Sequence, residues 1–193
     1  KEGDIGVLAG ATSWGMSLDE ALKDFQFIDS LPGEKYILKG NHDYWWNSKT
    51  KMEKFFKDHE LNSLHILHNN SLRTDDGIVV CASRGWLFEN GEAHDKKILA
   101  REAGRLELSI QDGIKKFREG DRLVVFMHYP PVYGSEISEE ILEVLHKYEI
   151  KHCFYGHIHS AGCMYALNGE FESINFKLIS ADGLGFSVFK VQL

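Results

Sequence analysis

The N-terminal part of the chain alternates short apolar runs with an amphipathic segment. Residues 5–8 and 35–38 are each dominated by apolar side chains and bounded by glycine or charged residues, which is typical of buried strands. Between them, apolar residues recur at helical spacing over 18–28. The segment Ser17–Leu–Asp–Glu20 predicts the helix start, and Pro32–Gly33 predicts its end. This order predicts a right-handed βαβ unit with parallel strands.

The rest of the chain continues the alternation and then becomes rich in β-like segments. Together these patterns predict a layered α/β fold with two packed β-sheets rather than one open sheet, in one domain that spans residues 1–193. A region without periodicity, 83–95, is expected to be a long loop. The expected helices are 49–57, 98–117 and 137–148, the last capped by Ser135 or Ser138; the expected strands are 64–67, 78–82, 123–126, 152–155, 163–167, 176–180 and 186–191.

Composition narrows the classes of function. The 193 residues carry a net charge of -7, which argues against a general nucleic-acid-binding protein. A small phosphorylated substrate is still compatible, because a metal ion can supply local positive charge. The three cysteines have no paired spacing, which is typical of a reduced, intracellular protein. No signal peptide or membrane-spanning run is seen, so we expect a cytoplasmic protein without a membrane partner.

Polar side chains with metal-binding chemistry follow three predicted strands. These are Gly40–Asn–His–Asp43, His128 and Gly156–His–Ile–His159. Because ligands bind at the carboxyl ends of strands in α/β sheets, we expect the three segments to converge. Imidazole nitrogen and amide oxygen suit Mn, Fe, Zn and similar ions. On an extended backbone, His157 and His159 would point to the same side.

Each segment alone has an ordinary explanation. Asn and Asp are common in turns, and a histidine after a strand is usually a polar loop residue. The combination in one short chain is a stronger indication of a metal site than any single piece. The other histidines are expected to be surface or packing residues: His59, His65, His68, His94, His146 and His152.

The same three segments, in this order, resemble the calcineurin-like metallophosphoesterases. The similarity extends to a bacterial branch of predicted phosphohydrolases, and it covers nearly the whole chain. It includes Thr12–Ser–Trp–Gly–Met16, Tyr44–Trp–Trp46, Arg84–Gly–Trp86 and Leu99–Ala–Arg–Glu–Ala–Gly–Arg–Leu106. The resemblance implies a four-layer fold, a β-sandwich flanked by helices, with two metal ions at the strand ends. It implies a phosphoesterase that hydrolyses phosphomono- or phosphodiesters, in which a metal-bound hydroxide attacks phosphorus.

The resemblance also implies roles for the metal-binding residues. Asn41, His128 and His157 would hold one divalent ion, and His159 would help to hold the other. The donor set does not choose between Mn, Fe, Zn and Ni.

Further roles follow for residues beside the metals. His42 would act as general acid or stabilise developing charge, and Asp43 would hydrogen-bond His42 and set its tautomer. Arg84 is a candidate contact for the substrate phosphate, with a solvated loop arginine as the alternative. The two tryptophans that follow Asp43 are expected to pack under the site.

Two features depart from the family pattern. The first motif, Asp-x-His, is not present, so the domain is expected to lack its first strand. Ala11 occupies the position of the carboxylate that bridges the two metals. Asp4 is not a substitute, because it precedes the strand while Ala11 follows it, so the two lie roughly 20 Å apart. We therefore expect at most one well-held metal. The alternatives to an active enzyme are a catalytically impaired scaffold and a mononuclear metal-binding protein.

Overall fold

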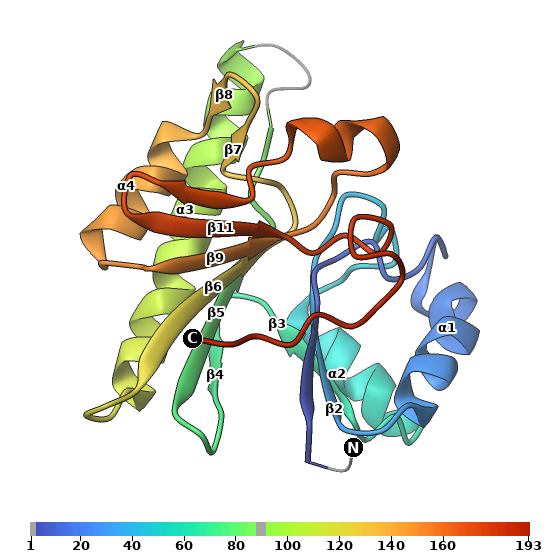
Figure 1. Ribbon diagram of the computed structural model, residues 1–193. Coiled ribbons are helices and arrows are strands. Elements are labelled where there is room, and N and C mark those ends of the chain that lie inside the picture. Colours follow the sequence, from blue (N-terminus) through green and yellow to red (C-terminus); the bar gives the residue numbers. More distant parts are fainter. Residues whose placement is uncertain (1–2, 88–91) are drawn as a thin grey trace.

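The computed structural model describes residues 3–87 and 92–193. Two β-sheets face each other, and helices cover the outer face of each (Figure 1). In chain order the elements are β1 (Ile5–Leu8), α1 (Leu18–Ser30), β2 (Glu34–Leu38), α2 (Lys49–Asp58), β3 (Leu64–Leu67), β4 (Ser71–Arg73), β5 (Ile78–Ser83), α3 (Glu92–Lys116), β6 (Arg122–Met127), β7 (Val132–Tyr133), β8 (Glu136–Ile137), α4 (Glu139–Lys147), β9 (His152–Tyr155), a 3-10 helix η1 (Ser160–Tyr165), β10 (Gly169–Phe171) and β11 (Ile174–Leu178).

The smaller sheet has the order β1-β2-β3, and its strands are parallel. The expected βαβ unit is therefore confirmed. Ser17 accepts a hydrogen bond from the N–H of Glu20, which begins α1, and the Glu20 carboxylate reaches back to the N–H of Met16. The prediction that β1 is buried was wrong. It is an edge strand whose first residue, Ile5, is 39% exposed.

The larger sheet has the order β10-β11-β9-β6-β5-β4. Its four central strands are parallel, and the two outer strands pair antiparallel to their neighbours. Three of the parallel strands, β5, β6 and β9, are largely buried, in agreement with their continuous apolar sequences. Their carboxyl ends therefore lie along one edge of the sheet.

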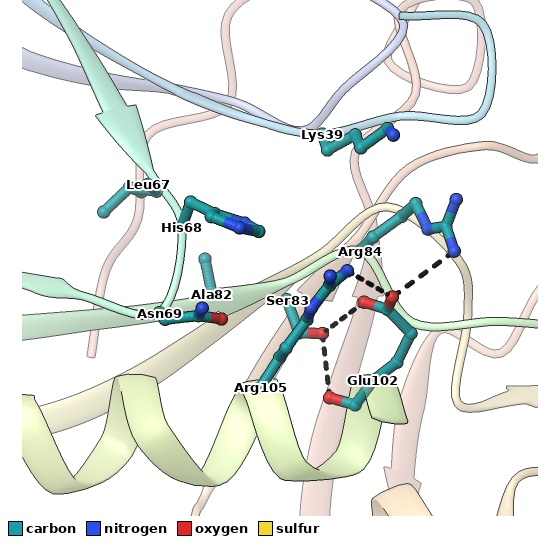
Figure 2. A pocket seen from close by; sticks show the side chains of 9 residues that line it. All are labelled: Lys39, Leu67, His68, Asn69, Ala82, Ser83, Arg84, Glu102 and Arg105. Carbon is teal, nitrogen blue, oxygen red and sulfur yellow. Dashed lines mark hydrogen bonds and ion pairs between the residues drawn. The ribbon is translucent and has the colours of Figure 1, made fainter. Parts of the chain in front are cut away.

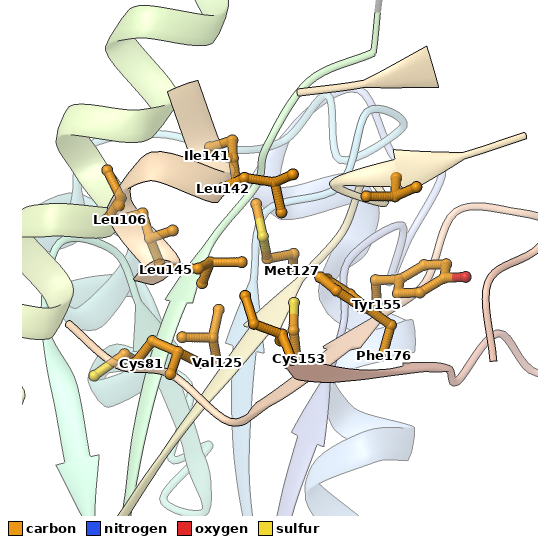
Figure 3. Close-up of a cluster of buried hydrophobic side chains, with 14 of the residues drawn as sticks. Cys81, Leu106, Val125, Met127, Ile141, Leu142, Leu145, Cys153, Tyr155 and Phe176 are labelled. Atoms are coloured by element: carbon orange, nitrogen blue, oxygen red, sulfur yellow. The ribbon is translucent and has the colours of Figure 1, made fainter. Parts of the chain in front are cut away.

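Three clusters of buried side chains separate the four layers. Leu38 and Leu67 of the smaller sheet meet Val80, Phe126 and Phe154 of the larger one, forming the core between the sheets. A second cluster joins the smaller sheet to α1 and α2. The third and largest joins the larger sheet to α3 and α4 (Figure 3). The two packed sheets flanked by helices are the fold expected from the sequence.

Several element predictions need correction. Helix α3 begins at Glu92 rather than at residue 98, so the expected loop 83–95 is shorter; residues 88–91 lie outside the described part. Residues 160–165 form the helix η1 instead of the expected strand 163–167. Residues 186–191 are irregular rather than a strand. Ser138 precedes α4, but its hydroxyl donates to the carbonyl of Trp86 instead of capping the helix. No helix among the described residues is long and apolar enough to cross a membrane.

Candidate metal centre

The loops that follow β2, β6 and β9 meet at one point. Nε2 of His128 lies 2.7 Å from Oδ1 of Asn41 and 3.2 Å from Nδ1 of His157. The sequence separations are 87 and 29 residues, so only the fold brings these atoms together. The expected convergence of the three segments is thus observed for these three side chains.

The hydrogen bonds of His128 determine which of its nitrogens carries a proton. Nδ1 lies 2.7 Å from the carbonyl oxygen of Ala9, which can only accept, so Nδ1 is the donor. Nε2 of the neutral ring is then a lone pair, and it faces Oδ1 of Asn41, which is also an acceptor as oriented here. At most one proton, on Nδ1 of His157, lies between these three side chains. A divalent cation fits such a cluster of electron-pair donors, since imidazole and amide oxygen are both accepted metal ligands.

The electrostatic surroundings keep the two imidazoles neutral. Burial lowers the pKa of His128 to about 3, and the neighbouring His157 and Arg84 act in the same direction. Burial also lowers the pKa of His157 to about 4, with contributions from His159 and His42. Because only neutral imidazole can coordinate a metal, both rings are in the binding-competent form at neutral pH.

Glycines allow the three loops to pack this closely. A Cβ atom at Gly40 would lie 2.1 Å from the backbone nitrogen of Ala11. Gly10 has φ of +89°, and a Cβ there would lie 2.8 Å from Nδ1 of His128. Gly156 is in looser contact, with a Cβ position 3.3 Å from the carbonyl oxygen of Ala9. The glycines before Asn41 and His157 therefore serve close approach between backbones.

Asp43 is fully buried beside this cluster. Its carboxylate accepts hydrogen bonds from five N–H groups: those of Ala11, Thr12, Ser13 and Gly40, and the indole of Trp45. The expected hydrogen bond between His42 and the carboxylate of Asp43 is not present, because the carboxylate accepts from these other donors. Asp43 thus ties the loop after β1 to the loop after β2.

His42 lies between aromatic side chains. Its ring stacks on that of Trp14, with centroids 4.1 Å apart, and its Nδ1 lies 3.2 Å from the hydroxyl of Tyr44. Trp14 is 68% exposed, so this stack forms part of the surface around the cluster. Trp45, in contrast, is 1% exposed and packs under the site as expected.

A comparison with protein-family models connects this geometry to known proteins. The model described as calcineurin-like phosphoesterase matches residues 3–161, which include every side chain of the cluster. The chain belongs to the calcineurin-like phosphoesterase family. A search of curated proteins found no match. Members of this family are metal-dependent phosphoesterases, so a divalent ion at the cluster agrees with both the family and the donor atoms.

Asp182 contacts His159, one of the candidate metal ligands, although its sequence context matches no motif. Its carboxylate lies 2.7 Å from Nδ1 of His159 and accepts the N–H groups of Ser160 and Gly183. The N–H of Ser160 and the ring of His159 hold the pKa of Asp182 well below its usual range. No family motif includes this aspartate, and it lies in an irregular segment, so only the fold reveals the pair.

The expected geometry of the His-x-His pair is wrong. His157 has φ of +67°, so the backbone is not extended and the two rings differ in their partners. His157 faces His128, whereas His159 is hydrogen-bonded to Asp182.

The position of Ala11 has a backbone conformation that is unusual for alanine. Its φ is +55°, in the left-handed region, which aspartate and asparagine adopt more readily. The backbone at this position would therefore accept an aspartate. Among the described residues, no group of three or more His, Cys, Asp and Glu side chains is arranged to hold a metal. The candidate centre depends on the amide of Asn41.

Arg84 does not belong to this cluster. It lies at the end of β5 and lines an adjoining cavity with Lys39, His68 and Arg105 (Figure 2).

Proposed function

We propose that this chain is a metal-dependent phosphohydrolase that cleaves phosphomono- or phosphodiesters of small substrates. The observation that carries the proposal is the cluster of Asn41, His128 and His157, in which Nε2 of His128 has no proton and lies beside Oδ1 of Asn41 and Nδ1 of His157. Membership of the calcineurin-like family supports the class of reaction.

Asn41, His128 and His157 would hold the metal ion, one of Mn, Fe, Zn or Ni. A divalent cation supplies positive charge to a bound phosphoryl group and makes water acidic enough to act as a nucleophile near neutral pH. His159 would contribute to a second, weaker site. Asp182 fixes the proton of His159 on Nδ1, which leaves Nε2 as the coordinating atom.

His42 would protonate the leaving oxygen or stabilise the charge that develops on it. Its stack on Trp14 and its contact with Tyr44 hold the ring at the edge of the cluster. Asp43 would act by holding the loop at Ala11 against Gly40, rather than by orienting His42.

The alternative is a protein of the same fold that binds one metal, or none, without efficient catalysis. Ala11 favours this alternative, because without a bridging carboxylate two adjacent dications repel each other with little compensation. We therefore expect one metal ion per chain and slow turnover.

The test is elemental analysis of protein purified without chelator, followed by assays of phosphomonoester and phosphodiester hydrolysis with Mn, Fe, Zn and Ni. The informative variant is His157→Gly, because glycine accepts the positive φ at this position. It should lose most of the bound metal and of the hydrolysis. His65→Ala, an exposed histidine paired with Glu34, is the control and should retain both. Equal metal content in both variants would contradict the proposal.

A further inference from the structure

A cavity with a cationic lining adjoins the candidate metal centre. Its empty volume, which includes open solvent, is about 270 Å³, and its wall comes from the ends of β2, β3 and β5 and from α3 (Figure 2). Lys39, Arg84 and Arg105 contribute three positive charges, and Glu102 contributes one negative charge. The cavity is therefore positively charged, although the whole chain carries a net charge of -7.

Glu102 neutralises only part of this charge. It is completely buried, and its carboxylate accepts from Arg105 at 2.8 Å and from Arg84 at 3.3 Å. Ser83 also donates to it, at 3.3 Å. Three donors therefore share one carboxylate, and most N–H groups of the two guanidinium groups do not contact it.

Two cationic side chains in the cavity have donor groups without a hydrogen-bond partner in the part of the chain that the structure describes. Nε of Arg84 is buried and makes no hydrogen bond. The ammonium group of Lys39, which is half-buried, makes no hydrogen bond or ion pair with the described residues. Buried donors are rarely left unsatisfied in proteins, because such a donor loses its hydrogen bonds to water without a replacement. Such donors indicate a ligand that accepts hydrogen bonds and carries negative charge.

The arrangement of the cations suits an oxyanion. Lys39 and Arg84 extend toward the same side of the cavity, and the ring of His68 points into the space between Lys39 and Arg105 (Figure 2). The guanidinium of Arg84 also lies 4.8 Å from the ring centroid of Trp86, which limits its movement. A planar, oriented guanidinium beside an ammonium group is a common combination for binding phosphate oxygens.

The positive charge of the cavity also acts on His68. Burial and then the charge of Arg105 lower the pKa of His68. An anion in the cavity would offset the effect of Arg105.

The cavity is close to the candidate metal centre along the chain. Lys39 precedes Asn41 by two residues. The carbonyl oxygen of Arg84 accepts the N–H of Tyr129, the residue after His128, at 2.8 Å. Both cations are thus attached to the loops that carry the proposed metal ligands.

We propose that this cavity is a second oxyanion site, which binds a non-scissile phosphate group of the substrate through Lys39 and Arg84. That the anion is part of the substrate rests on the proposed function; the anion site itself does not. The chain would then prefer substrates with two anionic groups over simple esters.

The first experiment measures binding of inorganic phosphate by equilibrium dialysis to chelator-treated protein, so that no metal contributes. We expect one phosphate per wild-type chain. Lys39→Gln should weaken binding about tenfold or more, because a charged hydrogen-bond partner is lost. Arg84→Lys should also weaken binding while keeping a positive charge opposite Glu102. The control is Lys23→Gln, an exposed lysine of α1, which should bind like the wild type. Absence of binding by the wild type, or equal binding by Lys39→Gln, would overturn the proposal.

The second experiment distinguishes a substrate group from a free ion. Hydrolysis of a para-nitrophenyl phosphodiester is compared with that of the same ester carrying an additional phosphate group. If the anion belongs to the substrate, Lys39→Gln raises KM for the second ester only. An equal KM increase for both esters, or an increase for neither, would show that the site does not bind the additional phosphate and would overturn the substrate part of the proposal. If neither ester is hydrolysed, the proposed function fails, while the dialysis experiment still decides whether the anion site exists.

Discussion

The backbone N–H of Ala11 donates to Oδ2 of Asp43 at 2.9 Å, across 32 residues of sequence. The same oxygen accepts the N–H of Gly40 at 2.7 Å. One carboxylate oxygen thus joins the loop after β1 to the loop that carries Asn41 and His42. The positions of the proposed metal ligand and proton donor depend on this contact.

We expect Asp43→Asn to destabilise the protein strongly. Asparagine offers one acceptor oxygen where five N–H groups require a carboxylate, and its NH₂ group would face some of those donors. The free energy of unfolding should fall by about 2–3 kcal/mol or more, measured by urea titration. The control is Asp58→Asn, an exposed residue paired with Lys54, which should change stability by less than about 1 kcal/mol. Similar effects of both variants would show that the buried carboxylate does not hold the loops.

Ala11→Asp should change metal binding. The left-handed backbone at this position accepts aspartate, and the carboxylate would add negative charge beside the cluster of Asn41, His128 and His157. The metal content should rise above that of the wild type, and phosphodiester hydrolysis should increase.

The matched control is Ala11→Asn, which has the same shape and the same preference for positive φ but no charge. Both variants relieve the backbone strain, and only the aspartate should raise the metal content. An equal rise in both would assign the gain to the backbone, and no rise in either would contradict the expected role of this position.

His42→Ala should lower kcat by about 10²–10⁴, the usual range for a lost general acid, while the metal content stays unchanged. Trp14→Ala removes the ring that stacks on His42 and should lower kcat to a smaller extent. Tyr44→Phe removes only the hydroxyl that lies 3.2 Å from Nδ1 of His42. Comparing this variant with Trp14→Ala distinguishes the effect of the hydrogen bond from the effect of the stacking. If His42→Ala keeps full turnover in metal-loaded protein, His42 has no role in proton transfer.

The sequence predicted the framework of the site better than its details. Periodicity predicted β2, β6 and β9, and the residue types after these strands selected Asn41, His128 and His157, whose side chains the structure brings together. This succeeded because strand ends in parallel sheets converge by topology alone. The failures occur where backbone conformation is irregular. Because His157 has a positive φ, His157 and His159 face different partners instead of pointing to the same side, and no local sequence pattern indicates this conformation.

Two other features could not be derived from sequence patterns. Asp182 reaches His159 from a segment without regular structure, so neither periodicity nor a motif marks it. The orientation of Asp43 toward Ala11 instead of His42 depends on how two loops pack through Gly40. Contacts of this kind, between irregular segments distant in sequence, require the three-dimensional structure.

Acid should destabilise the metal-free protein through His128. In the unfolded chain this ring takes up a proton near its ordinary pKa of about 6.5. In the folded chain burial lowers the pKa to about 3. Between these values the unfolded state binds more protons, so stability is full above the upper value and falls as pH decreases, by about 1.4 kcal/mol per pH unit. Urea unfolding of chelator-treated protein between about pH 6.5 and 4 measures this slope. His128→Gln should give a shallower slope, and equal slopes would contradict the neutral, buried state of this imidazole.

Two glycines of α3 provide a test of the packing between this helix and the larger sheet. A Cβ at Gly104 meets no atom within 4 Å, whereas a Cβ at Gly113 would lie 2.7 Å from Sγ of Cys81 and 3.0 Å from Cγ1 of Val79. Gly104→Ala should therefore stabilise the protein by about 0.5–1 kcal/mol, the helix preference of alanine over glycine. Gly113→Ala gains the same preference but must displace β5, so it should destabilise by about 1–3 kcal/mol. Thermal unfolding of the two variants measures the difference, because both make the same substitution in one helix. If Gly113→Ala is as stable as Gly104→Ala, the helix does not lie against Cys81 as the structure has it.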